Sequence, residues 1–213
     1  MLTSNARLPL RAWQAVDTLN VNGFAIPVIL VKLYGALKDN GGLEEEGIFR
    51  LAPDAVKCDE LREALDNDGE ALERIGKGTD AHILANLIKI WFRRLPIRLL
   101  AGISSEQIGA CDSGAKCMAL LQGFPTLQKG LFLWLLEMMA DVAERGSVNR
   151  MNERAIAIVV APNLYDPPDP GDCPNPMAAL TYTQGMSRFV TELLVYYVYT
   201  RKRVRQESAV SLP

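Results

Sequence analysis

The strongest constraint on the fold is a run of apolar residues at helical spacing between residues 80 and 95. Its five members recur every three or four residues: Leu84, Leu87, Ile88, Trp91 and Leu95. Such spacing places them on one face of an α-helix, where they can be buried together. Pro96 follows directly, and it disfavours helical geometry in the residue before it. We therefore predict an amphipathic helix that ends near Leu95.

Further helices are predicted from boundary signals as well as from apolar spacing. Residues 26–38 begin beside a proline and run into an Asn-Gly-Gly stop, and residues 53–65 end before an Asp-Asn-Asp-Gly turn. Both patterns are typical of a helix with its punctuation. Ser104, followed three residues later by Gln107, predicts a capping box at the start of another helix.

The second half of the chain carries three more apolar segments. Thr126 is expected to cap a long helix that closes at Gly146. The run AIAIVV at 155–160 is rich in β-branched residues, so its composition alone fits a buried strand or a buried helix. Its neighbours favour a helix. A last helix is predicted from about Gln184 to Thr200.

Length and pattern together predict one all-α domain, a helical bundle with one long Pro/Asp-rich loop. A chain of 213 residues fits one domain, and we identify no long alternating segment, hairpin dipeptide or internal repeat that would point to a β-rich fold. The segment DPPDPGDCPNP at 166–176 predicts an exposed loop. We expect an N-terminal extension over 1–21, the domain over 22–200 and a basic, polar tail over 201–213.

Composition excludes several classes of function. The formal net charge of −2 provides no positive field for nucleic acid, and the apolar runs are too short to cross a bilayer. No secretory signal is visible at the N-terminus. Four cysteines without CxxC spacing and a single histidine argue against zinc and favour reduced thiols in the cytoplasm. We expect no metal and no cofactor.

Three local features suggest enzyme chemistry and are better explained otherwise. Gly76-Lys77-Gly78-Thr79 lacks the spacing and the Ser or Thr of a phosphate-binding loop, and we interpret it as a surface turn. His82, the one histidine, is more often a packing or surface residue than a catalytic base. The acidic run at 44–46 fits a solvated surface better than a metal site.

Three segments occur in a familiar order: LEEEGIFRLA at 43–52, LIKIWFRRLP at 87–96 and NRMNERAIAIVVAPN at 149–163. Together they resemble the RhoGAP domain, the GTPase-activating domain of Rho-type signalling. The likeness spans about residues 22–200 and is greatest to the plant-type members that act on ROP GTPases. The resemblance implies an all-helical fold and a helix at 155–160.

The resemblance places Arg50 in the position of the arginine finger. Hydrolysis of GTP builds charge on the γ-phosphoryl group, and a planar guanidinium inserted from a second protein stabilises that charge. Ile48 and Phe49 stand just before it and are expected to anchor the loop while Arg50 projects. Without the other two segments, Arg50 would be an ordinary surface arginine after a turn.

Four more residues are candidates for contact with a GTPase or support of the finger. In the family, the lysine matching Lys89 contacts the GTPase and the arginine matching Arg93 braces the finger loop. Both could instead form a solvated basic face of their helix. Asn163 matches the asparagine that approaches the GTPase, or it could end its helix in a left-handed conformation. Asn149 is the weaker candidate, with a structural role favoured.

The sequence departs from the family pattern beside the finger and beyond the last helix. Leu51-Ala52-Pro53 replaces a pair of small residues, and Arg94 replaces a glutamate, which reverses a charge. The basic cluster RKRVR at 201–205 either meets anionic lipid or complements a helix C-terminus. These are the positions where activity or partner choice could differ.

These features predict a GTPase-activating protein for a Rho, Rac or ROP GTPase in its GTP-bound form. The GTPase would bring nucleotide and magnesium, so this chain needs no nucleotide site of its own. We expect a cytoplasmic monomer that meets a membrane only through its GTPase. The alternative is a weak or inactive RhoGAP-fold module that binds a GTPase or another signalling partner.

Overall fold

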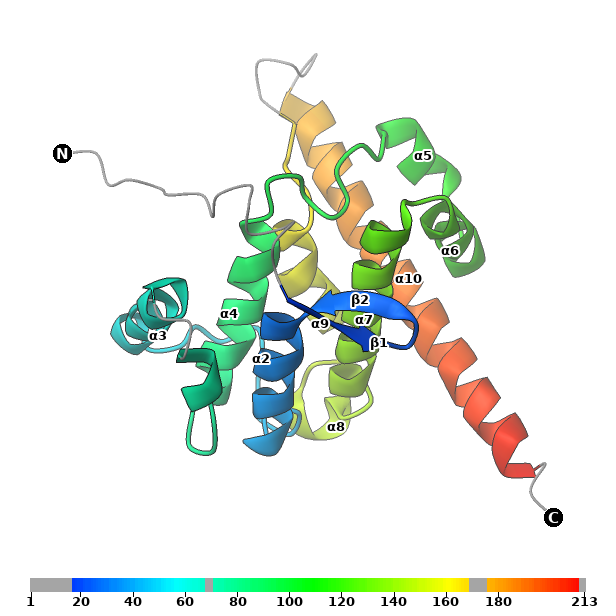
Figure 1. Cartoon of the computed structure of the whole chain (residues 1–213). Helices are drawn as coiled ribbons and strands as arrows, with labels where there is room; N and C mark the ends of the chain where they lie inside the picture. Colours follow the sequence, from blue (N-terminus) through cyan, green and yellow to red (C-terminus); the bar gives the residue numbers. More distant parts are fainter. Residues whose placement is uncertain (1–16, 68–70, 169–175, 211–213) are drawn as a thin grey trace.

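The computed structural model describes residues 17–67, 71–168 and 176–210, and these residues form a mostly helical bundle (Figure 1). Its elements, in chain order, are β1 (Thr18–Val21), β2 (Phe24–Pro27), α2 (Val28–Asp39), α3 (Ala55–Asn67), the 3-10 turn η1 (Ala71–Arg74), α4 (Ala81–Arg93), α5 (Ser105–Ala110), α6 (Gly114–Gln122), α7 (Thr126–Ala143), α8 (Gly146–Asn149), α9 (Glu153–Val160), the 3-10 turn η2 (Ala161–Asn163) and α10 (Pro176–Val210). The predicted all-α class is confirmed.

Helix α7 forms the centre of the bundle. It is apolar on almost every side, and Leu135, Leu136, Met138 and Met139 have no exposed surface. A helix with this composition is stable only where other elements cover all its faces. Strand β2 and helices α9 and α10 pack around it, as Figure 1 shows. The core therefore lies along α7.

Helix α4 confirms the apolar stripe and corrects its end. Leu84, Leu87 and Ile88 are buried, and Asp80 caps the helix by accepting from the backbone amides of His82 and Ile83. The helix ends at Arg93, before the predicted Leu95. The apolar spacing predicts the position of the helix correctly. Its end is less well predicted, because Pro96 disfavours helical geometry in the residue before it.

A small antiparallel hairpin was not predicted. Strands β1 and β2 pair through Val21 and Phe24, and Asn22 and Gly23 both have positive φ, 52° and 85°. Asn-Gly is a favoured dipeptide for such a two-residue turn, but each strand has only four residues. The expected N-terminal extension over 1–21 therefore includes a paired strand, and the remainder of it, residues 1–16, lies outside the described residues.

The hairpin sits directly on α7 (Figure 1). At Gly130 of α7, an added Cβ would lie 2.6 Å from Cδ1 of the Phe24 ring. Only a glycine allows the ring to approach the helix this closely. The hairpin is thus fitted into the bundle and covers one face of its core.

The middle of the chain confirms one predicted cap and corrects another. Ser104 accepts from the amide of Gln107, and the Gln107 side chain accepts from the amide of Ser104, which completes the capping box. Thr126 is the first residue of α7, not its cap, because Pro125 occupies the cap position. The helix closes at Ala143 rather than Gly146. The ambiguous run at 155–160 is helical, as expected.

Helix α10 is much longer than predicted at both ends. It begins at Pro176 instead of Gln184 and continues to Val210 instead of Thr200, so its last turns extend past the body of the bundle (Figure 1). The expected tail from residue 201 is helical through residue 210. Of the predicted loop at 166–176, residues 169–175 lie outside the described part of the chain.

Candidate functional site

The loop between α2 and α3, here called the finger loop (residues 40–54), presents Arg50 to solvent. Ile48 and Phe49 are 0% and 1% exposed and belong to the core, whereas Arg50 is exposed. The expected anchoring by Ile48 and Phe49 is confirmed. Phe49 has a φ of 66°, an uncommon conformation for a bulky residue. Two buried neighbours thus hold a strained turn from which Arg50 projects.

Gly47 is the pivot of this turn. Its carbonyl accepts hydrogen bonds from the amides of Arg50 (2.8 Å) and Leu51 (2.9 Å). Its φ is 69°, and an added Cβ would lie 2.8 Å from Cγ of Leu51. Both the conformation and the crowding require glycine here. The backbone ahead of Arg50 is therefore closely specified.

Asn149 fixes the finger loop from the opposite side. It is fully buried, and its amide nitrogen donates to the carbonyls of Leu43 (2.7 Å) and Val142 (2.8 Å). Its side-chain oxygen accepts from the amide of Met151, and its backbone carbonyl accepts from the amide of Gly47 at 2.8 Å. With these groups engaged and no exposed surface, Asn149 supports the loop and cannot face a partner.

Lys89 joins helix α4 to the finger loop. Its Nζ donates a hydrogen bond of 2.6 Å to the carbonyl of Phe49, the residue before Arg50. Burial, together with the nearby Arg93 charge, lowers the pKa of Lys89 below its ordinary value. In this chain Lys89 therefore makes the backbone contact that the family resemblance assigned to Arg93.

Arg93 lies one turn further along α4, and its side chain is exposed. It has no hydrogen bond or ion pair with any other described residue, so its guanidinium is open to solvent in this chain. Because residues four apart share a helix face, Lys89 and Arg93 flank the finger loop from the same side. The solvated alternative fits Arg93 and does not fit Lys89.

Asn163 ends the short turn η2, which packs against α4. It is 7% exposed, and its amide nitrogen donates to the carbonyls of Val159 and Val160, both at 3.1 Å. Asn163 does not have a positive φ, so the left-handed cap considered for it is wrong. Within the described residues, Asn163 has no hydrogen bond to Arg50, and the packing of η2 on α4 brings it toward the site.

Comparison with known proteins identifies the family of this chain. A model of the RhoGAP domain matches residues 27–169, well over half of the chain. The chain belongs to the RhoGAP family. Two curated relatives are Rho GTPase-activating protein gacA of Dictyostelium discoideum, 37% identical over 85% of this chain, and Rho GTPase-activating protein 5 of Arabidopsis thaliana, 36% identical over 89%.

The curated relatives are longer than this RhoGAP chain. It spans 51% of the Dictyostelium protein and 52% of the Arabidopsis protein. The likeness to plant members is confirmed, and the Dictyostelium protein is equally similar. Among solved structures, human Rho GTPase activating protein 15 matches with a TM-score of 0.66 and 19% identity, covering 80% of this chain and 82% of that one. This establishes a RhoGAP fold.

The two departures from the RhoGAP pattern have defined environments. Leu51 is 48% exposed beside Arg50, with its Cγ packed close to Gly47. Arg94 forms an ion pair with Asp66 of α3, with Nη1 and Oδ2 3.1 Å apart. The reversed charge at Arg94 is thus matched within the chain, and the pair joins α3 to the end of α4.

The glycine-rich segment that mimics a phosphate-binding loop has a structural role. Gly76 and Gly78 form a turn tied to Asn40, whose side chain accepts from the Gly78 amide at 2.6 Å and donates to the Gly76 carbonyl at 3.1 Å. His82 Nε2 lies 3.6 Å from a Glu45 oxygen. In the described parts of the chain, no group of His, Cys, Asp or Glu has the arrangement of a metal site.

The cysteines are not part of the candidate site. Cys58, Cys111 and Cys117 are buried free thiols, and burial raises the pKa of Cys117 to about 12. Cys173 lies outside the described residues. Within the described residues, no helix is long and apolar enough to cross a membrane.

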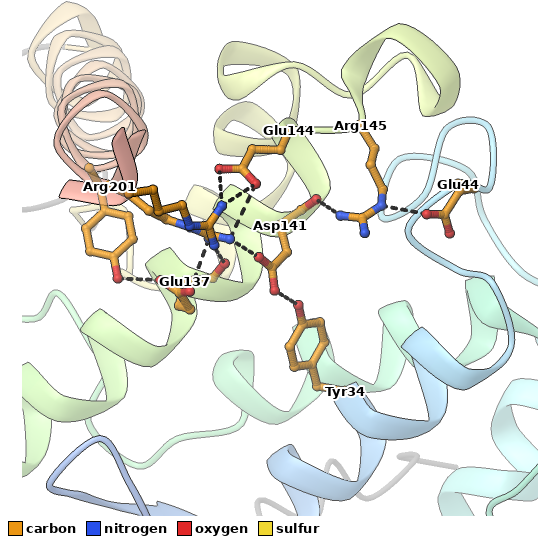
Figure 2. A network of polar contacts seen from close by, with 9 residues as sticks. Tyr34, Glu44, Glu137, Asp141, Glu144, Arg145 and Arg201 are labelled. Carbon is orange, nitrogen blue, oxygen red and sulfur yellow. Dashed lines mark hydrogen bonds and ion pairs between the residues drawn. The ribbon is translucent and has the colours of Figure 1, made fainter. Parts of the chain in front are cut away.

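Sequence reasoning missed an ion network on the side of α7 that faces α10 (Figure 2). Its centre is Arg201, which is 11% exposed and pairs with Glu137 and Asp141 of α7 and with Glu144, the C-cap of that helix. Burial alone would lower the pKa of Arg201, but its bonds to Asp141 and the other carboxylates raise it. The three acidic residues at i, i+4 and i+7 of an apolar helix were the available signal.

The network changes the interpretation of the basic cluster at 201–205. Arg201 and Arg205 both pair with Glu144 at the C-cap of α7, and Arg203 pairs with Glu207. Because α10 continues to Val210, the cluster does not lie at a helix C-terminus, and the proposed complement to the helix dipole there is wrong. Most of its charge is matched within the chain, which leaves little for anionic lipid.

Proposed function

We propose that this chain stimulates GTP hydrolysis by a Rho, Rac or ROP GTPase and supplies Arg50 as an arginine finger in trans. The observation that carries the proposal is Arg50 itself, exposed on a strained turn whose preceding residues are buried in the core. A finger held this way loses little conformational freedom when it enters a partner's site. The Dictyostelium and Arabidopsis relatives are named as Rho GTPase-activating proteins.

The chemistry needs little from this chain besides Arg50. The GTPase in its GTP-bound form brings the nucleotide, the magnesium ion and the attacking water, and the guanidinium neutralises charge that develops in the transition state. Such a finger is worth about 10³ to 10⁵ in rate. In this proposal Lys89 and Asn149 hold the loop through their hydrogen bonds, and Arg93 and Asn163 contact the GTPase. The chain would act as a cytoplasmic monomer recruited to the membrane by its partner.

A second candidate is a RhoGAP-fold module that binds a GTPase without accelerating hydrolysis. The exposed Leu51 next to the finger favours it, because an apolar side chain at this position can bury surface on a partner without taking part in chemistry. The two candidates differ in one quantity, the rate of hydrolysis in the bound complex.

Single-turnover hydrolysis separates these candidates. The wild-type chain, Arg50→Ala and Arg50→Lys are titrated against GTP-loaded Rho, Rac, ROP and Ras proteins, with Arg203→Ala on α10 as a matched control. The proposal expects acceleration on at least one Rho-type protein, a loss of about 10³-fold or more in Arg50→Ala, and no effect of the control. Binding without acceleration by the wild type would select the second candidate.

A further inference from the structure

Arg145 connects the finger loop to the end of α7 (Figure 2). Its Nε donates to Oε1 of Glu44 at 2.5 Å, and its Nη1 donates to the backbone carbonyl of Asp141 at 3.1 Å. Glu44 stands three residues before Gly47, the pivot of the finger turn. One guanidinium therefore ties a side chain of the finger loop to the central helix.

Glu44 belongs to an acidic run that is close in sequence to Arg50. Three consecutive carboxylates, Glu44, Glu45 and Glu46, precede the finger by six to four residues and are all exposed. Opposite charges attract each other when their side chains can meet. A finger paired with its own loop could not also reach a phosphate. In the structure Arg50 has no ion pair with any described residue, and the Glu44 carboxylate points to Arg145 instead.

The Asp141 carboxylate does not compete with Glu44 for Arg145, because it has two other partners. The carboxylate of Asp141 accepts from the Tyr34 hydroxyl and from Arg201, both at 2.5 Å. It is therefore engaged elsewhere, and only its backbone carbonyl binds Arg145. Figure 2 shows Arg145 pointing away from the Arg201 cluster and toward Glu44. The carboxylates of α7 thus do not compete with Glu44 for the guanidinium.

We propose that Arg145 is a positioning residue for the finger: it holds Glu44 against the end of α7 and so keeps this carboxylate from capturing Arg50. Asn149 already fixes the backbone of the loop at Leu43 and Gly47. Arg145 fixes the Glu44 side chain, which stands between these two points. The inference rests on the proposed function of Arg50, since it concerns how that guanidinium is kept available.

The test is a set of single-turnover measurements with saturating amounts of each variant. Glu44→Gln keeps the size of the side chain and replaces the carboxylate by a neutral amide. This amide can neither bind Arg145 firmly nor capture Arg50. Arg145→Gln leaves the carboxylate free to capture Arg50. We expect Arg145→Gln to lower the saturated rate by about fivefold, the equivalent of one partly exposed ion pair. The half-saturating concentration should stay unchanged.

The rates of the single and double variants distinguish this positioning role from a general loss of stability. Glu44→Gln should stay nearer to the wild-type rate, and the double variant with Arg145→Gln should recover the rate that Arg145→Gln alone loses. In an Arg50→Ala background, Arg145→Gln should have no further effect, because no finger remains to be captured. Lys116→Gln, which removes the exposed pair between Lys116 of α6 and Asp112 just before that helix, is the matched control.

Three results would overturn the inference. They are a wild-type rate for Arg145→Gln, a failure of Glu44→Gln to rescue it, and an equal loss in the Arg50→Ala background. Should no GTPase respond to the wild type, the proposed function fails separately, and hydrogen exchange then decides the inference. Faster exchange of the Arg50 and Leu51 amides in Arg145→Gln, reversed by Glu44→Gln, supports it, and unchanged exchange refutes it.

Discussion

The ammonium of Lys89 lies 2.6 Å from the carbonyl oxygen of Phe49. This bond ties the middle of α4 to the residue that precedes Arg50, across forty positions of sequence. Phe49 is also the residue with the unusual positive φ. A charged donor on its carbonyl offsets part of the cost of that conformation. Lys89 is thus part of the support of the finger in the chain alone.

Replacement of Lys89 by methionine tests this support. Lys89→Met keeps most of the side-chain volume and removes the donor, so we expect the saturated rate of GTP hydrolysis to fall about tenfold, the effect of one charge-assisted hydrogen bond. Arg93→Met is the control on the same helix face. Its exposed side chain should change the half-saturating concentration more than the rate. If Arg93→Met lowered the saturated rate and Lys89→Met changed mainly the half-saturating concentration, Arg93 rather than Lys89 would support the finger loop.

Replacement of Gly47 by alanine should misplace the finger without unfolding the chain. The new Cβ would lie 2.8 Å from Leu51 Cγ at a φ of 69°, so the loop must shift, and small displacements of a catalytic group can cost about 10²-fold in rate. Gly78→Ala is the matched control, since Gly78 also has a positive φ, 93°, but open space around it. Equal rates for the two variants would contradict the crowding argument.

Replacement of Asn149 should be costly to stability. Asn149→Ala removes three buried side-chain hydrogen bonds. The Leu43 carbonyl and the Met151 amide lose these bonds outright, whereas the Val142 carbonyl keeps its bond from the Arg145 amide, and we expect a loss of about 2–4 kcal/mol in the free energy of unfolding. Denaturant titration measures this loss. Asn67→Ala, at the exposed end of α3, should change the same quantity by less than about 0.5 kcal/mol. A mild effect of Asn149→Ala would refute its structural role.

Local patterns predicted most of the fold, and their failures have a common cause. The α4 stripe and the Ser104 capping box depend on neighbours within a few positions, so sequence shows them directly. The buried anchors Ile48 and Phe49 were expected from the family resemblance. The hairpin was missed although Asn22-Gly23 signals it, because four-residue strands give too little alternation. Elements of this size are stable only on a partner surface, here α7.

The misassigned parts depend on contacts between distant residues. Residues 201–210 are polar and lack a helical stripe, but ion pairs with α7 hold Arg201 across about sixty positions. The bond from Lys89 to Phe49 is equally non-local. Family resemblance identified Lys89 as important without showing which way its ammonium points. Contacts of this kind become visible only once the helices are placed.

Tyr34, which donates a hydrogen bond to Asp141 of α7, should make stability sensitive to alkaline pH. Burial and a hydrogen bond to Asp141 raise the pKa of Tyr34 above its ordinary 10.0. A raised folded pKa stabilises the native state below the ordinary pKa, and this contribution is lost as pH rises above about 10. Tyr34→Phe should therefore lower stability at pH 8 and flatten its decline between about pH 10 and 11. Tyr199→Phe is the exposed control.

Urea titrations of both variants at closely spaced pH values measure this effect. The informative quantity is the difference in unfolding free energy between wild type and Tyr34→Phe, because other groups of the chain also titrate in this range. That difference should shrink as pH rises. A constant difference would show that the Tyr34 hydroxyl keeps its proton equally well in the unfolded chain.

Truncation distinguishes a structural end of α10 from a dispensable tail. A chain that stops at Thr200 loses Arg201, which is 11% exposed and faces three carboxylates in and just after the last turns of α7. We expect its unfolding free energy to fall by about 2–3 kcal/mol, below the range for a fully buried pair because the carboxylates are partly exposed. A chain that stops at Gln206 keeps Arg201 and Arg205 and should match the full chain. Equal unfolding free energies of the two truncated chains would show that the network does not stabilise the fold. In that case the carboxylates that pair with Arg201 would lose their partner without any loss of stability.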